Sequence, residues 1–121
     1  MPEDETAPAA SVLQDPTAHD DLDDWGPVPD MIEGQSHTDG TLLHKGPDGE
    51  SECGIWECTP GHWECVVERD EFCHFLGGRA TYYPEDGEAF EVREGTVAFF
   101  PEGWTGTCEV HDTVRKVYMC R

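Results

Sequence analysis

The sequence predicts an all-β protein: a double-stranded β-helix, or jelly-roll barrel, that follows a disordered acidic arm. Three observations carry this prediction. Short segments of alternating apolar and polar residues recur from residue 51 onward, glycine and proline turns separate them, and no stretch keeps a helical period. Many short strands with such punctuation are typical of sandwiches and barrels.

The elements follow in order along the chain. Residues 1–24 hold few apolar side chains among Pro, Ala, Thr and Asp, so we expect them to be disordered. Trp25 is expected to begin the folded domain, over residues 25–121, because an exposed Trp in a polar tail is costly. Strands are predicted over residues 41–44, 54–58, 63–67, 71–76, 79–83, 89–92, 96–100, 106–110 and 114–120.

The charge of the chain restricts its partners. Asp and Glu number 27 against 7 Lys and Arg, for a net charge of -20. Such a surface disfavours nucleic acid and anionic membranes, and it is typical either of an ordinary acidic protein or of one suited to high salt. No signal peptide or long apolar run is visible, which indicates a cytoplasmic protein whose six cysteines are reduced.

Two glycine spacings and four segments of the chain carry a family resemblance. Glu71 lies seven residues before Gly78, and Gly95 precedes Pro101-Glu-Gly103. Residues 54–61, 70–76, 101–110 and 114–118 resemble the small single-domain cupins. The resemblance is to the group of ureidoglycine aminohydrolase-like and ethanolamine-utilisation-like proteins. It implies a small β-barrel with an internal pocket, and it leaves the activity open.

The resemblance also shows which metal ligands have changed. The wider cupin pattern places three histidines and one glutamate around a metal ion. Counted on this chain, the histidine positions fall on Cys65, Val67 and Gly106, and only Glu71 remains. An iron or manganese centre of the dioxygenase kind is therefore not expected, because such metals need imidazole at those positions.

Strand alternation suggests a different site. If Glu71 faces the pocket, then Cys65, Cys73 and Cys108 face it too. Two thiolates with a carboxylate or an imidazole can hold zinc and leave a position open. The predicted zinc ligands are Cys65, Cys108, Glu71 and His62, with Glu71 also the candidate catalytic residue. The alternative is that these cysteines pack in the core as small apolar residues.

Aromatic side chains offer a second kind of site. Alternating aromatics can line a pocket for a small organic ligand, or they can simply fill the core. The candidate ligand-binding residues are Trp56, Trp63, Tyr82, Phe99 and Trp104.

These patterns support three functional hypotheses. The first is a small metal-dependent cupin enzyme acting on a polar metabolite by lyase, isomerase or hydrolytic chemistry. The second is a metal-free cupin that binds or senses a small molecule, and the third is a redox-sensitive thiol protein. We also expect a homodimer, because alternation puts apolar Phe72 and Leu76 on the outer face of their strand.

Overall fold

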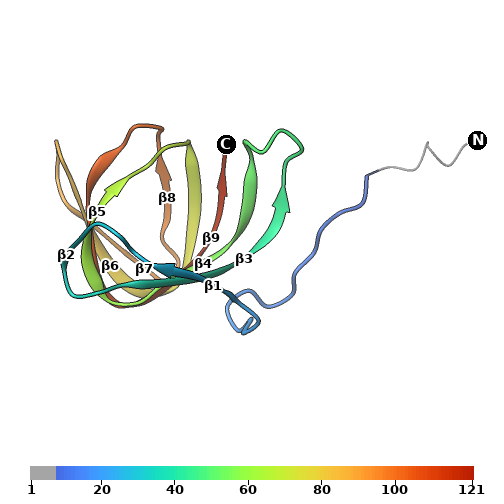
Figure 1. Cartoon of the computed structure of the whole chain (residues 1–121), viewed down its shortest axis with the longest axis horizontal. Helices are drawn as coiled ribbons and strands as arrows, with labels where there is room; N and C mark the ends of the chain where they lie inside the picture. The colour runs from blue at the N-terminus through green and yellow to red at the C-terminus, as the bar shows by residue number, and fades with distance from the viewer. Residues whose placement is uncertain (1–7) are drawn as a thin grey trace, which may run out of the picture.

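The computed structural model describes residues 8–121, which form nine strands and no helix (Figure 1). All strand pairs are antiparallel, so the predicted all-β jelly-roll barrel is confirmed. Within this range no helix is long and apolar enough to cross a membrane. The strands are β1 (Asp23–Pro27), β2 (Met31–Glu33), β3 (His37–Lys45), β4 (Glu52–Cys58), β5 (Gly61–Val66), β6 (Glu71–Pro84), β7 (Phe90–Arg93), β8 (Val97–Phe100) and β9 (Thr105–Cys120).

Two long strands form the spine of the barrel. β6 and β9 pair along their whole length, from Glu71 opposite Cys120 to Pro84 opposite Gly106. The other edge of β9 pairs with β5 in its first half and with β4 in its second half. The other edge of β6 pairs with β8 and then with β7.

The spine therefore divides the sheet into two halves that curl toward each other (Figure 1). One half has the order β1-β3-β4-β9-β6-β8, and the other has the order β2-β5-β9-β6-β7. Side chains of alternate residues point into the space between the halves. This arrangement puts a continuous core inside one barrel, as the alternation in the sequence predicts.

The long strands replace pairs of shorter ones that the sequence predicts. Gly77 and Gly78 were expected to end a strand, but β6 continues through them, with the register shifting between Phe75 and Ala80. Gly78 has a φ of 84°, and a Cβ there would collide with the carbonyl of Thr113 on β9. These glycines bend the strand through bulges, which is how a long strand passes a barrel corner.

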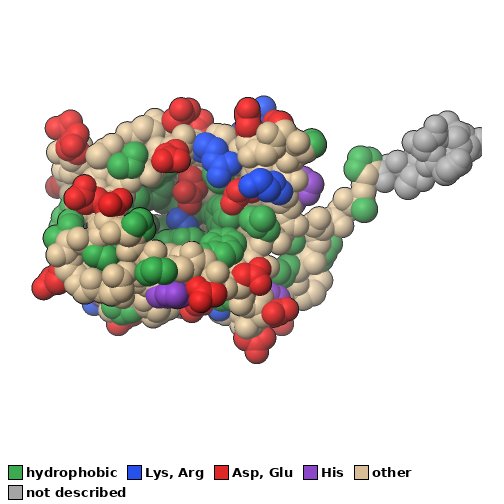
Figure 2. Space-filling model, in the orientation of Figure 1, with side chains coloured by type: hydrophobic (Ala, Val, Ile, Leu, Met, Phe, Trp, Pro, Cys, Tyr) green, Lys and Arg blue, Asp and Glu red, His purple; other side chains and the backbone are tan. Residues whose placement is uncertain are grey.

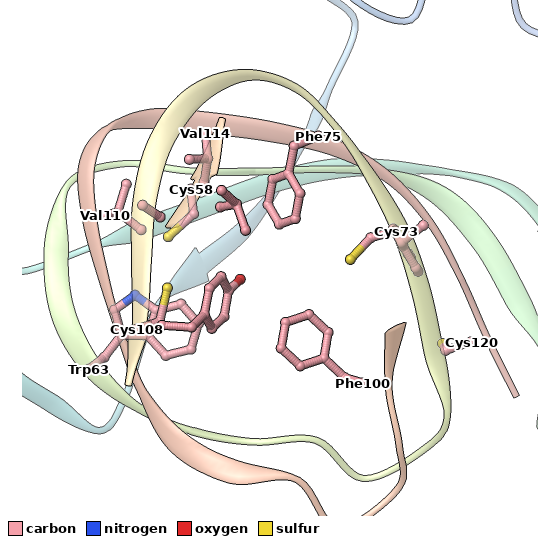
Figure 3. Packing of buried hydrophobic residues seen from close by; sticks show 13 residues of the cluster. Cys58, Trp63, Cys73, Phe75, Phe100, Cys108, Val110, Val114 and Cys120 are labelled. Carbon is pink, nitrogen blue, oxygen red and sulfur yellow. The ribbon is translucent and has the colours of Figure 1, made fainter. Parts of the chain in front are cut away.

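The core lies inside the barrel, between the two halves of the sheet. Phe75, Val92 and Val114 are completely or almost completely buried, together with the thiols of Cys58, Cys73 and Cys108. Figure 3 shows Cys108 beside Trp63, while Cys73 lies on the opposite side of the barrel section.

The arm forms no strand between residues 8 and 22, but part of it contacts the barrel. The Arg115 guanidinium donates hydrogen bonds to the carbonyls of Pro16 (2.8 Å), Thr17 (3.3 Å) and His19 (2.6 Å). The same guanidinium pairs with Glu57 at 2.6 Å. The sequence also predicts disorder for residues 1–7, and these lie outside the residues that the structure describes.

Candidate functional site

The barrel contains an open cavity of about 350 Å³ between its two halves. Its volume falls in the range of pockets that hold small organic ligands. Figure 2 shows the mouth as a hollow with hydrophobic side chains inside and charged side chains around it. The lining residues are Trp25, Glu52, Trp56, Trp63, Cys65, Val66, Val67, Glu68, Arg69, Glu71, Tyr82, Phe100, Lys116, Tyr118 and Cys120.

The polar centre of the cavity is an ion pair. The Nζ of Lys116 on β9 lies 2.7 Å from Oε2 of Glu71 at the start of β6. The Lys116 side chain is 9% exposed and the Glu71 side chain 20%. Burial by itself lowers the pKa of Lys116, but the charge and hydrogen bond of Glu71 outweigh it and raise the pKa above its usual value. Lys116 is therefore a cation at neutral pH.

Aromatic rings surround this cation. The Nζ of Lys116 lies 4.5 Å from the ring centre of Trp56 and 5.7 Å from that of Phe75. Trp63 contacts Trp56 edge to face, with ring centres 6.4 Å apart. The rings exclude water and hold the ammonium by cation–π attraction, so the charge is kept at one place in the cavity.

A second polar group borders the mouth. The hydroxyl of Tyr118 donates to Oε2 of Glu52 at 2.7 Å, and Lys45 and Arg69 lie 3.3 and 3.4 Å from the other oxygen. The Tyr118 hydrogen bond is the main reason that the pKa of Glu52 lies below its usual value. Lys45 and Arg69 act in the same direction, and burial opposes them.

The structure places Cys65 and Cys108 on the inner face, as alternation predicts, but only Cys65 lines the cavity. Burial raises the pKa of Cys65 to about 11 and that of Cys108 to about 12. Both are thus neutral thiols at neutral pH. Cys73 is also buried, and its thiol donates to the carbonyl of Ala98 at 3.7 Å.

The four predicted zinc ligands do not form one group in the part of the chain that the structure describes. His62 alternates with the inward-facing Trp63, and its Nε2 lies 3.0 Å from the hydroxyl of Thr107. Among residues 8–121, only Asp24, His37 and Asp39 bring three possible ligand atoms within 4.8 Å of one another. They lie between β1 and β3, with the His37 Nε2 2.7 Å from Asp24 and 3.7 Å from Asp39.

The predicted aromatic residues divide between the cavity and other places. Trp56, Trp63 and Tyr82 line the cavity. Phe99 is 60% exposed on the outer face of β8, and its neighbour Phe100 occupies the cavity wall. Trp104 packs against the ring of Phe100, 5.1 Å away, and belongs to the partly buried surroundings of the core.

Sequence reasoning assigned no cavity role to Lys116, Trp25 or Glu52. Alternation counted from Cys108 along β9 places Lys116 inward, so the pattern of the sequence could have predicted its position in the cavity. Trp25 reaches the cavity because its ring lies over Gly40, where a Cβ would collide with it. No motif marks this contact, since it depends on the pairing of β1 with β3.

Comparisons with known proteins agree with this fold. Residues 45–118 match the family described as the EutQ-like cupin domain. A search of curated proteins found no match.

Several solved structures have the same fold. The EutQ protein of Clostridium difficile is 20% identical, with a TM-score of 0.61 over 70% of this chain and 68% of its own. An ethanolamine utilization protein Q of Salmonella typhimurium LT2 is 24% identical, with a TM-score of 0.60 over 69% and 68%. A protein of unknown function from Pseudomonas syringae is 21% identical, with a TM-score of 0.75 over 83% of this chain and 44% of its own. The match to residues 45–118 covers more than half of the sequence, and the barrel agrees with it: the chain belongs to the EutQ-like cupin family.

Proposed function

We propose that the chain binds a small organic molecule in the barrel cavity, with the Lys116 ammonium in the role of a metal ion. The observation that carries this proposal is the 2.7 Å pair of Lys116 and Glu71. The cupin pattern makes Glu71 the one remaining metal-ligand position. Beside it, the ammonium supplies the positive charge that a metal ion would otherwise supply.

The state of the thiols supports a cavity without metal. Zinc held by Cys65 and Cys108 would have to displace two thiol protons, and burial raises the pKa of both thiols. Cys65 and Lys116 line the same cavity. The Lys116 cation would therefore repel a zinc ion bound there. The zinc enzyme predicted from the sequence is therefore the second hypothesis.

The walls indicate the class of ligand. Trp56, Trp63 and Tyr82 offer flat apolar surfaces, which favour a planar group. The hydrogen bond to Glu71 uses one of the three N–H donors of Lys116. The ammonium can donate to an acceptor oxygen of the ligand as well. A small carboxylate or ketone with a planar apolar part fits both features.

The same pair gives the proposal an enzymatic variant. An ammonium and a carboxylate 2.7 Å apart can serve as proton donor and acceptor at one carbonyl compound. Lys116 would stabilise the oxygen of an enolate, while Glu71 would take a proton from the adjacent carbon and return it. Uptake of deuterium from heavy water by a bound keto acid tests for this isomerase-type chemistry.

Binding is tested by titrating the full chain with benzoate, phenylpyruvate and pyruvate while tryptophan fluorescence is recorded. Trp25, Trp56 and Trp63 line the cavity, so an occupant should change their emission. We expect saturable binding of the planar acids. Lys116→Gln should weaken it at least tenfold, and Glu71→Gln should strengthen it, because the ammonium is released from its carboxylate partner.

Lys45 provides the matched control, since it is the other lysine of the chain and does not line the cavity. Lys45→Gln should bind these acids as the wild type does. Binding that is equally strong in Lys116→Gln would contradict the proposed role of the ammonium. Loss of binding in both lysine variants would point to the overall charge and not to the cavity.

A further inference from the structure

A segment of the chain, residues 23–33, crosses from one half of the barrel to the other. It begins with β1, which pairs with β3 at the edge of one half, and it ends with β2, which pairs with β5 at the edge of the other half (Figure 1). We call residues 23–33 the strap. The family match begins at residue 45, so the strap lies outside the segment that this chain shares with the family.

The strap is fixed to the barrel at several points. The amide of Val28 donates a hydrogen bond to the carbonyl of Ser36 at 3.0 Å. Nearer its other end, the carbonyl of Asp30 accepts a hydrogen bond from the amide of Glu64 on β5 at 2.9 Å. Val28 and Met31 also pack against the buried core. The strap therefore holds the side chains that it carries in a defined place.

Trp25 is the residue of the strap that reaches the cavity, and a bulge directs it there. The register of β1 with β3 steps from Asp24 opposite Asp39 to Gly26 opposite Thr38, so Trp25 is the extra residue between two paired ones. Gly26 has a φ of 92°, a conformation that favours glycine. Such a bulge re-aims a side chain, and here the indole of Trp25 lines the cavity.

A glycine makes room for this indole. Gly40 on β3 pairs with Trp56 on β4, and Trp56 pairs with Lys116 on β9. A Cβ on Gly40 would collide with the ring of Trp25, so this ring occupies the side-chain space that Gly40 leaves free. Residues that pair across strands share one face of a sheet. The ring of Trp25 thus extends the inner wall that Trp56 and Lys116 form.

The cavity has a buried inner end and an exposed rim. Lys116 and Trp63 are buried, whereas Trp25 is 38% exposed and lies at the rim. A ligand oxygen that accepts a hydrogen bond from the Lys116 ammonium would occupy the inner end. The rest of the ligand would extend toward the rim, beside the indole of Trp25.

We propose that Trp25 selects the ligand of the cavity, because its indole forms the outer wall of the site and packs on the ring of a bound aromatic acid. This inference rests on the proposed binding function, and it adds a specificity-determining residue from outside the family segment. Contacts between aromatic rings stabilise a complex beyond the burial of their area. A short acid such as pyruvate has no ring for the indole to contact, so its binding should not depend on Trp25.

The test is isothermal titration calorimetry of the full chain with phenylpyruvate and with pyruvate. Trp25→Ala should weaken the binding of phenylpyruvate about fivefold, the effect of one aromatic contact, and leave the binding of pyruvate unchanged. Trp25→Phe should retain most of the preference for phenylpyruvate. Tyr83→Ala is the matched control, since Tyr83 is 39% exposed and does not line the cavity. This variant should bind both acids as the wild type does.

A second measurement needs no ligand. Cys65 lines the cavity, whereas Cys53 is half-buried outside it. Trp25→Ala should therefore increase the rate at which N-ethylmaleimide labels Cys65 but not Cys53, as measured by mass spectrometry of the peptides. An unchanged rate for Cys65 would overturn the place of Trp25 as the outer wall.

The two measurements separate this inference from the proposed function. If neither acid binds the wild type, or if Lys116→Gln binds them equally well, the proposed function fails and the selection by Trp25 fails with it. If Lys116→Gln binds more weakly while Trp25→Ala keeps the full preference for phenylpyruvate, only the role of Trp25 is overturned.

Discussion

The charged groups of Lys116 and Glu71 lie 2.7 Å apart inside the barrel, although 45 residues separate them in the sequence. Each group balances the charge of the other in a place that is largely shielded from water. Removing one partner from a buried pair leaves an uncompensated charge, whereas removing both does not.

Replacing Lys116 alone should therefore destabilise the fold more than replacing both Lys116 and Glu71. We expect Lys116→Met to lower the free energy of unfolding by about 3–5 kcal/mol, the usual cost of breaking a buried ion pair. The double variant Lys116→Met/Glu71→Gln should recover a large part of this loss. Urea unfolding at neutral pH gives the free energy of unfolding of the wild type, of both single variants and of the double variant. Simple addition of the two single effects would show that the residues do not interact.

The zinc hypothesis and the metal-free hypothesis predict opposite zinc contents for the purified protein. If Lys116 takes the place of a metal ion, protein grown with added zinc and purified without a histidine tag should contain far less than one zinc per chain. Elemental analysis measures this directly. One tightly bound zinc would instead favour the site predicted from the sequence.

Three cysteine variants then locate any zinc that is found. Cys65→Ser and Cys108→Ser should release a metal bound by these thiols. Cys58→Ser is the control, because Cys58 is a buried thiol that does not line the cavity. Release from none of them would direct attention to Asp24, His37 and Asp39 on the surface.

Glu52 should make stability fall on acidification. Its pKa is lowered in the folded chain, chiefly by the Tyr118 hydrogen bond, so the unfolded chain takes up the proton first. The contribution of Glu52 is complete above its ordinary pKa of 4.5 and is lost as the pH falls through the lower folded value. Other carboxylates titrate in the same range. The measurement is therefore the difference between wild type and Glu52→Gln, which should shrink steadily below pH 4.5.

The arm should be dispensable for folding but not for full stability. A chain that begins at Asp24 should keep its β-type circular dichroism spectrum, since residues 8–22 contribute no strand. It should lose about 1–3 kcal/mol, because Arg115 loses carbonyl acceptors, and hydrogen bonds to charged groups are worth about that much.

A chain that begins at Ser11 is the control for the arm. It keeps Pro16, Thr17 and His19, whose carbonyls accept hydrogen bonds from Arg115, and it should melt as the full chain does. If truncation at Asp24 leaves the melting temperature unchanged, the contacts to Arg115 contribute nothing to stability. If it abolishes the fold, the arm is part of the domain.

The barrel and its inner surface could be predicted from the sequence because strand alternation has a fixed period of two. Counting from Glu71 placed Cys65, Cys73 and Cys108 inward without any knowledge of their neighbours. The same rule failed for Phe99, since the start of a short strand decides which of two adjacent aromatics turns inward. Phe100 took that place, and Phe99 lies exposed on the outer face of β8.

Sequence alone thus determined the all-β class, the position of the barrel and which residues face inward, because these follow from local patterns of apolar residues, glycine and proline. Only the tertiary structure decided which inward residues meet. The pair of Lys116 and Glu71 depends on the register of β6 with β9, and the position of Trp25 depends on the pairing of β1 with β3. A local pattern carries no information about such contacts, so the chemistry of the cavity emerged only when the strands were paired.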